Sequence, residues 1–212
     1  MREDSILREL RELPENVMID YITFSGRGEP TMASNLGSTI TAVRRLRHEQ
    51  IAVITNSSLM TREDVREEMS LADFVIAKLD ASSRESFVLI NRPFRSLSFH
   101  DVVEGIKEFR KYFQGKFALQ IMFVQQNAHL AGNIAQLARE INPDEVQINT
   151  PLRRCGAKAL SKEALSQIKE FFEGTNTITV YEVQKKIVTP ISDKDTLRRR
   201  GKVPKTERAY QS

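Results

Sequence analysis

The chain has 212 residues, of which 40% are hydrophobic and 28% charged, a balance that is ordinary for a globular domain and excludes fibrous and disordered classes. No run approaches the roughly 18 apolar residues of a membrane span, and the charged start Met1–Leu10 does not resemble a signal peptide. One cysteine, Cys155, excludes an internal disulfide and, with three histidines, a cysteine-rich zinc site. We therefore expect a protein of the reducing cytoplasm.

The net charge of +4 is unevenly distributed. Between Lys185 and Ser212 nine basic residues stand against three acidic ones, so this segment carries +6 and residues 1–184 carry −2. We divide the chain accordingly into a core domain, residues 1–184, and a basic, mobile C-terminal extension, residues 185–212. The Arg198–Lys202 cluster would suit RNA phosphates, but Tyr210 is the only aromatic residue of the extension, so base stacking is poorly supported.

Six short runs rich in Val, Ile or Phe predict strands buried on both faces, and helical patterns alternate with them. In chain order the expected elements are helix Ser5–Leu13, strand Val17–Phe24, helix Asn35–His48, strand Ile51–Thr55, helix Thr61–Met69, strand Phe74–Leu79, helix His100–Phe113, strand Phe117–Val124, helix Leu130–Ile141, strand Glu145–Asn149, helix Ser161–Phe172 and strand Thr177–Val183. Thr61 has the form of a capping box and Ser161 of an N-cap.

This alternation predicts a parallel sheet with right-handed crossovers, and it fits both an open doubly wound sheet and a closed or partial barrel. In either case ligands collect at the carboxyl ends of the strands. The connection Ala81–Phe99, which contains Asn91-Arg92-Pro93, is too long for a simple turn and predicts a functional loop.

The sharpest motif follows the first predicted strand and reads Thr23-Phe-Ser-Gly-Arg-Gly-Glu-Pro-Thr31. Its glycines, Gly26 and Gly28, let the backbone approach a ligand and free N–H groups for it. Glu29 adds a carboxylate suited to an ammonium group, and Pro30 stiffens the exit. The residues alone fit either a site for a small zwitterion or phosphate, or a tight strand-to-helix turn.

The segment Ile22–Thr31 resembles the glycine–glycine–glutamate motif of the radical S-adenosylmethionine (SAM) superfamily, in its form ending Gly-Glu-Pro-Thr. Later segments are similar in order and spacing to the branch of archaeal iron–sulfur oxidoreductases and tRNA wyosine-base synthases. These segments are Ile54–Ser57, Ala77–Ala81, Ile90–Pro93, Gln120–Val124 and Val146–Leu152. The resemblance covers residues 5–172 and implies an α/β fold, a partial (β/α) TIM-like barrel that lacks its first strand.

The resemblance also implies how the chain would hold SAM. The glycine turn would bind the amino group of the methionine moiety. The end of the second predicted strand would bind the ribose, and the end of the third would bind the carboxylate or the ribose edge. The backbone near the end of the fifth predicted strand would contact the adenine. The implied cofactor-binding residues are Ser25, Gly26, Gly28, Glu29, Pro30, Asn56, Lys78, Asp80, Asn149 and Thr150. Asn91 and Arg92 would lie on the substrate side, where Arg92 would bind an anionic substrate. Purely structural roles stay open for Asn56, Lys78, Asp80 and Arg92.

The sequence departs from this family at the iron–sulfur cluster. In the family a Cys-x-x-x-Cys-x-x-Cys loop holds a [4Fe-4S] cluster, whose open iron chelates SAM for reductive cleavage to a 5′-deoxyadenosyl radical. This sequence has only Cys155, which we expect to be inert. Because the chain also opens on a helix, we expect the C-terminal part of a longer oxidoreductase with upstream cysteines, reduced by a flavodoxin or ferredoxin. Its substrate stays open, with RNA one candidate.

Three further expectations follow. Without a first strand, the exposed sheet edge would aggregate or pair with another copy. A cluster-free relative that only binds SAM or substrate is the main alternative function. A barrel enzyme that uses Lys78 in Schiff-base chemistry on a phosphorylated substrate is a third.

Overall fold

The computed structural model describes residues 2–14, 17–26, 28–153, 155–183 and 197. Six parallel strands form one sheet in the sequential order β1 to β6. The strands are β1 (Tyr21–Phe24), β2 (Gln50–Thr55), β3 (Phe74–Lys78), β4 (Lys116–Met122), β5 (Glu145–Asn149) and β6 (Thr177–Thr179).

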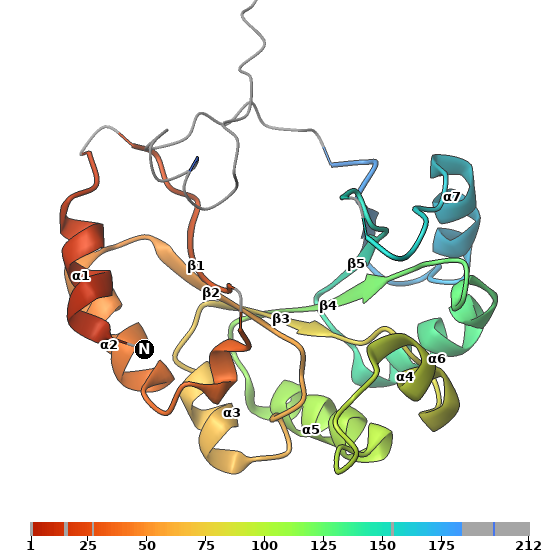
Figure 1. Ribbon diagram of the computed structural model, residues 1–212, viewed down its shortest axis with the longest axis horizontal. Helices are drawn as coiled ribbons and strands as arrows, with labels where there is room; N and C mark the ends of the chain where they lie inside the picture. Colours follow the sequence, from red (N-terminus) through yellow and green to blue (C-terminus); the bar gives the residue numbers. More distant parts are fainter. Residues whose placement is uncertain (1, 15–16, 27, 154, 184–196, 198–212) are drawn as a thin grey trace, which may run out of the picture.

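The helices lie on the outer side of this curved sheet, as Figure 1 shows. They are α1 (Glu3–Arg11), α2 (Leu36–Leu46), α3 (Glu63–Met69), α4 (Arg84–Asn91), α5 (Phe99–Tyr112), α6 (Ala131–Ile141) and α7 (Lys162–Glu170), with 3₁₀ turns η1 (Pro30–Met32) and η2 (Ala128–Leu130). A doubly wound sheet reverses its strand order and has helices on both faces. The sequential order with an outer helix layer therefore makes the sheet a partial barrel, which confirms the predicted fold class.

Side chains alternate between the two faces of the sheet. On the outer face Val53, Val75 and Leu119 belong to the main core, which packs against the helices. On the inner face a smaller buried cluster comprises Ala52, Phe74, Ile76 and Ala118, with Ile54 packed against it. Both faces are thus apolar through the middle of β2, β3 and β4, which explains why these strands are short and mostly apolar, whereas β5 alternates buried Val146 and Ile148 with polar residues.

Polar side chains replace this apolar lining toward the carboxyl ends of the strands. Lys78 pairs in register with Gln120, and Gln120 with Gln147, so three polar side chains stand side by side across β3, β4 and β5. The amide nitrogen of Gln120 donates to Oε1 of Gln147 at 3.1 Å. The inner face therefore changes from hydrocarbon to hydrogen-bonding groups at the edge where ligands of parallel barrels bind.

A repeated device fixes the opposite, amino end of the sheet. Asp73, which precedes β3, accepts from the N–H of Ile51 at 2.7 Å and from Arg44 of α2 at 3.0 Å. Asp144, which precedes β5, accepts from the N–H of Phe117 at 2.7 Å and from Arg110 of α5 at 2.8 Å. In both places one carboxylate ties a strand start to its neighbour and to an outer helix.

Several predicted boundaries are wrong at the edges of the fold. The strand expected from residue 17 begins only at Tyr21, and Met18 before it is 98% exposed. The last strand ends at Thr179, four residues before the predicted end. The expected cap Thr61 is also wrong, because α3 begins after Arg62 without a side-chain cap, whereas Ser161 does cap α7 by accepting from Ala164 N at 3.2 Å.

The long connection Ala81–Phe99 contains a helix that the sequence analysis did not predict. Its helix, α4, begins at a capping box in which Ser83 and Ser86 bond each other's backbone N–H. The α4 helix ends at Arg92, whose φ of 46° lies in the left-handed region. Among the described residues no helix is long and apolar enough to cross a membrane. The predicted basic extension lies outside the described residues except for Leu197.

Candidate ligand site at the carboxyl edge of the sheet

The carboxylate of Glu29 straps the end of β1 to the end of β2. Its Oε1 accepts from the hydroxyls of Thr31 at 2.8 Å and Thr55 at 2.6 Å, and from the N–H of Thr31 at 3.3 Å. Its Oε2 accepts from the N–H of Asn56 at 2.7 Å. Each carboxylate oxygen offers about two acceptor positions, so Oε1, with three donors around it, is fully used. From the described residues Oε2 receives a single hydrogen bond, so it keeps capacity for one more donor.

The two glycines before Glu29 border open space. A Cβ placed on Gly26 or on Gly28 would meet no described heavy atom within 4 Å. Among the described glycines only Gly174 has a positive φ, so the backbone at Gly26 does not itself require glycine. A cavity of about 450 Å³ lies here, lined by Ser25, Gly26, Gly28, Glu29 and Pro30 together with apolar side chains of α1 and β1. The turn therefore leaves room for a ligand to approach its main chain.

The end of β2 combines a turn-forming side chain with an available amide. Oδ1 of Asn56 accepts from the N–H of Ser58 at 2.9 Å, which is the structural role left open for this residue. Within the described chain the side-chain nitrogen Nδ2 of Asn56 has no partner. Its neighbour Ser57, which the sequence analysis missed, is buried with φ of 68° and donates from its hydroxyl to the carbonyl of Lys78 at 3.0 Å.

Asp80 is the hub of the β3 end. It is 6% exposed, and its Oδ2 lies 3.6 Å from Nζ of Lys78 and accepts from Nδ2 of Asn91 at 3.1 Å. Its Oδ1 accepts from the N–H of Met122 at 2.8 Å. Asp80 is thus a structural acceptor, and the Lys78 ammonium is held in place by it. Asn91 anchors α4 to this hub, which positions the following Arg92.

Asn127, which sequence reasoning missed, completes this junction. It is fully buried, its Nδ2 donates to the carbonyls of Asp80 at 2.9 Å and Met122 at 3.0 Å, and its Oδ1 accepts from the N–H of Val124 at 2.8 Å. The Asn127 side chain thus joins the loops after β3 and β4. Its position directly after a predicted strand was the only sequence signal available for it.

A second, larger cavity of about 1100 Å³ opens over the ends of β3, β4 and β5. Its charged lining consists of Lys78, Asp80, Arg92 and Arg153. The rest of the lining comprises Ile54, Leu89, Ile90, Gln120, Met122, Val124, Gln126, Asn149, Thr150, Pro151, Leu152, Cys155, Gly156, Ala157 and Val180. The hydroxyl of Thr150 accepts from the N–H of Leu160 at 2.8 Å, so it pins the loop that forms one wall.

The predicted cofactor residues share one edge of the sheet but not one cavity. Ser25, Gly26, Gly28, Glu29 and Pro30 line the smaller cavity, and Lys78, Asp80, Asn149 and Thr150 line the larger one. Asn56 lines neither of these two, although its N–H is bonded to Glu29. A ligand that touched all of them would have to extend along the strand ends from β1 to β5.

The described residues contain no group of three or more His, Cys, Asp or Glu side chains placed to hold a metal ion. The whole sequence has one cysteine, Cys155, which is exposed and donates from Sγ to the carbonyl of Ala157 at 3.3 Å. A [4Fe-4S] cluster needs several thiolates. The residues of this chain therefore do not fit the cluster that the sequence resemblance implies.

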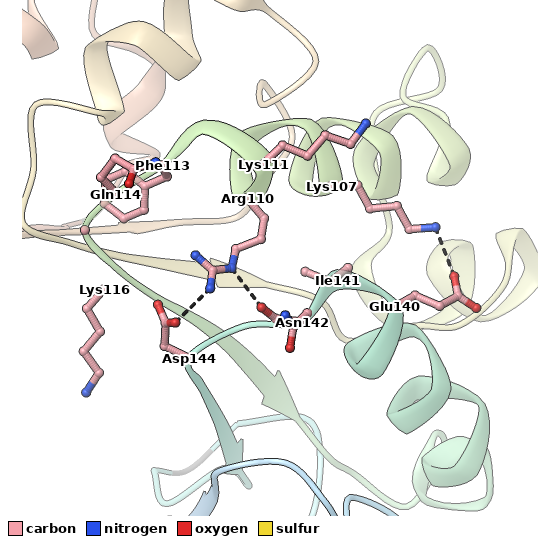
Figure 2. Close-up of a pocket in the computed structure, with 11 residues that line it drawn as sticks. Lys107, Arg110, Lys111, Phe113, Gln114, Lys116, Glu140, Ile141, Asn142 and Asp144 are labelled. Atoms are coloured by element: carbon pink, nitrogen blue, oxygen red, sulfur yellow. Dashed lines mark hydrogen bonds and ion pairs between the residues drawn. The ribbon is translucent and has the colours of Figure 1, made fainter.

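A third cavity, of about 790 Å³, lies at the amino end of the sheet between α5 and α6, and Figure 2 shows its lining. Lys107 reaches Glu140 at 3.0 Å, and Arg110 lies between Asp144 and the carbonyl of Asn142. Lys111 pairs with Glu108, and Lys116 with Glu145. Each of these four cations is neutralised by a described carboxylate, and the cavity lies at the end of a barrel that serves stability rather than chemistry.

The chain is thus a partial parallel barrel with polar groups at its carboxyl edge, the edge at which barrel domains bind small molecules. Residues 1–138 match the family model described as the Radical SAM superfamily. The chain belongs to this superfamily, which confirms the resemblance found in its sequence.

Individual proteins are also similar to the chain in sequence or in fold. The chain is 35% identical over 184 residues to a protein of Brachyspira hyodysenteriae named GTPase Obg, covering 84% of this chain and 27% of that protein. It is 38% identical over 149 residues to the UPF0026 protein slr1464 of Synechocystis, covering 70% and 56%. Streptococcus suis SuiB bound to S-adenosylmethionine has a similar fold, with a TM-score of 0.65, 15% identity, and coverage of 84% and 43%. The chain thus spans about a quarter to a half of these proteins.

Proposed function

We propose that this chain binds S-adenosylmethionine along the carboxyl edge of its sheet, with the amino group of the cofactor at the Ser25–Glu29 turn. Superfamily membership supports SAM as the cofactor. The observation that carries the proposal is the open main chain at Gly26, where glycine is required neither by φ nor by a neighbour among the described residues. Close approach of a ligand is the remaining physical reason for this residue.

Each predicted residue would then have a definite task. The spare acceptor position of Glu29 Oε2 would take one N–H of the SAM ammonium group, while the four hydrogen bonds that Glu29 accepts within the chain hold the turn. The side-chain nitrogen Nδ2 of Asn56, which has no partner in the described chain, would donate to the ribose. Lys78, oriented by Asp80, would face the carboxylate of SAM or the ribose edge, and the main chain at Asn149 and Thr150 would border the adenine.

Reductive cleavage of SAM is proposed only for an assembly that supplies the cluster. In this superfamily a bound [4Fe-4S] cluster delivers the electron, and this chain has one cysteine. We therefore propose that these 212 residues bind and orient SAM. The reductive cleavage would need a polypeptide that supplies three additional thiolates. The cluster-free binding relative remains the alternative. An RNA substrate, a flavodoxin or ferredoxin reductant and a cytoplasmic location stay predictions.

Isothermal titration of the full chain with SAM and S-adenosylhomocysteine tests the proposal. The decisive variant is Gly26→Ala, because its added methyl group meets no described atom within 4 Å and should leave stability unchanged or about 0.5 kcal/mol higher. We expect it to weaken SAM binding by at least about tenfold. Gly132→Ala is the control, since Gly132 lies on α6 and lines neither carboxyl-edge cavity.

Absence of heat with either nucleoside in a folded sample would refute the proposal, as would a Gly26→Ala variant with wild-type affinity. Glu29→Gln is a poorer probe, because a side-chain N–H₂ would face the donors that Glu29 now accepts from and would disturb the turn itself.

A further inference from the structure

We infer that Arg92 and Arg153 form a binding site for a small dianionic substrate with an apolar body, at the mouth of the larger carboxyl-edge cavity. The inference rests on the proposed function for its role, because the cavity serves as a substrate site only if SAM binds beside it. The ligand chemistry itself follows from the charges, volume and lining of the cavity.

The charge balance of this cavity is the first observation. Four of its described lining residues are charged, and the one carboxylate among these four, that of Asp80, is committed to Lys78, Asn91 and the N–H of Met122. Among the described residues neither Arg92 nor Arg153 has a hydrogen-bond or ion-pair partner. Two guanidinium groups therefore border the cavity without compensation, and their planar donor forks match carboxylate or phosphate oxygens.

The backbone of Arg92 is the second observation. Arg92 ends α4 in the left-handed region, at φ 46° and ψ 56°, a position that usually carries glycine or asparagine. A side chain with a Cβ costs about 1 kcal/mol there. Asn91, the residue before Arg92, is hydrogen-bonded to buried Asp80. Pro93, the residue after it, has a φ that its ring fixes. The chain thus holds an arginine in a strained conformation that places it at the cavity.

The size and apolar lining indicate the body of the ligand. A volume of about 1100 Å³ lies just above the range of about 300–1000 Å³ for small-molecule sites, so the cavity has room for a substrate beside a cofactor. Leu89 and Leu152 line it from α4 and from the loop after β5, and both are more than half exposed, at 59% and 57%. These two apolar side chains near the arginines suit a ligand that carries hydrocarbon between or beside its charges.

The cavity favours a small molecule over an RNA strand. Among its described lining residues, three side chains, those of Lys78, Arg92 and Arg153, are basic, and they face a cavity of small-molecule size, whereas a nucleic acid backbone is bound along an extended basic stripe. The amino-end cavity provides a contrast inside the same chain, since its four cations are all paired and offer no surplus charge.

The test uses inorganic pyrophosphate and adipate as probes for phosphate and dicarboxylate ligands, each titrated calorimetrically into the full chain without SAM. We expect at least one of them to bind. Arg92→Gln and Arg153→Gln should each weaken that binding about tenfold, as expected for loss of a charge-assisted hydrogen bond, and should leave SAM affinity within twofold of wild type. Arg95→Gln is the matched control, because Arg95 is exposed, lies three residues from Arg92 and does not line the cavity.

Failure of both probes to bind would overturn the inference, as would an equal loss of affinity in Arg95→Gln. Tighter binding of a single-stranded RNA decamer, weakened equally by all three variants, would also overturn it in favour of general backbone electrostatics. The two proposals fail separately. SAM binding without anion binding refutes only the arginine site, and anion binding without SAM binding refutes the proposed function.

Discussion

The two ends of the sheet carry many charges and arrange them in opposite ways. At the amino end the cations that line the cavity are paired with carboxylates, and the bonds of Asp73 and Asp144 fix where β2 and β4 begin. At the carboxyl end the carboxylates of Glu29 and Asp80 hold the loops, and two arginines lack a described partner. Charges that neutralise one another stabilise the barrel, whereas uncompensated charges at the other end are available to a ligand.

The two ends also differ in the burial of their side-chain hydrogen bonds, because Asn127 at the carboxyl end is fully buried. Removing its side chain should therefore give the largest effect on stability. Asn127→Ala would leave two carbonyls and the N–H of Val124 without partners at a fully buried position. We expect a loss of about 2–4 kcal/mol in the free energy of unfolding, measured by urea denaturation. Asn176→Ala at the amino end is the control, because its exposed side chain donates only to the carbonyl of Asp144 and should cost under about 1 kcal/mol. Similar losses in both variants would contradict the comparison.

The repeated aspartates should give an intermediate effect of nearly equal size. Asp73→Ala and Asp144→Ala each remove one acceptor from a strand N–H and one arginine ion pair, so we expect about 1–2 kcal/mol from each in urea denaturation. Asp64→Ala, which removes only the exposed pair with Arg62, should cost less than about 0.5 kcal/mol. If the two aspartates differed by more than about 1 kcal/mol, they would not be one repeated device.

The sequence predicted the centre of the fold better than its margins. Strands β2, β3 and β4 are buried on both faces, so their apolar runs are nearly continuous and their positions follow from composition. Val17 and Met18 are also apolar, but they lie before β1, and Met18 is exposed, which single residues cannot reveal. Helix α4 was missed because its apolar residues, Phe87 to Ile90, are consecutive rather than spaced at 3.6 residues.

The candidate site was likewise predictable from the sequence only in part. The Gly26–Glu29 turn could be found because its residue types are unusual within a few positions of one another. Arg153 and Asn127 could not, because their roles depend on residues distant in the sequence: Asn127 bonds the carbonyl of Asp80, 47 positions away. Charge that is unpaired in the folded chain is likewise a property of the tertiary arrangement, since 28% of all residues are charged and only the fold decides which have partners.

The pH dependence of stability should show the smallest effect, at the Lys116–Glu145 pair of the amino end. Burial of Glu145 raises its pKa, but hydrogen bonds from Lys116 and Gln147 outweigh this and hold the pKa below its ordinary value of 4.5. A depressed carboxyl pKa stabilises the folded state above pH 4.5, and the contribution is lost as the pH falls through the lowered value. Because the pair is partly solvated, we expect less than about 1 kcal/mol.

Urea denaturation of wild type and Glu145→Gln between pH 7 and pH 3 measures this contribution as the difference between the two proteins. The difference should be greatest at pH 7 and should shrink as the pH falls below 4.5 and through the lowered pKa of Glu145, because the carboxyl group then becomes protonated in the folded chain as well as in the unfolded chain. Lys116→Gln should reduce the same difference, because it removes the 2.7 Å contact to Glu145 and the ammonium 4.7 Å from the centre of the Phe74 ring. A difference that grew as the pH fell would mean that burial, and not Lys116, controls Glu145, and the amino end would then hold an uncompensated charge of its own.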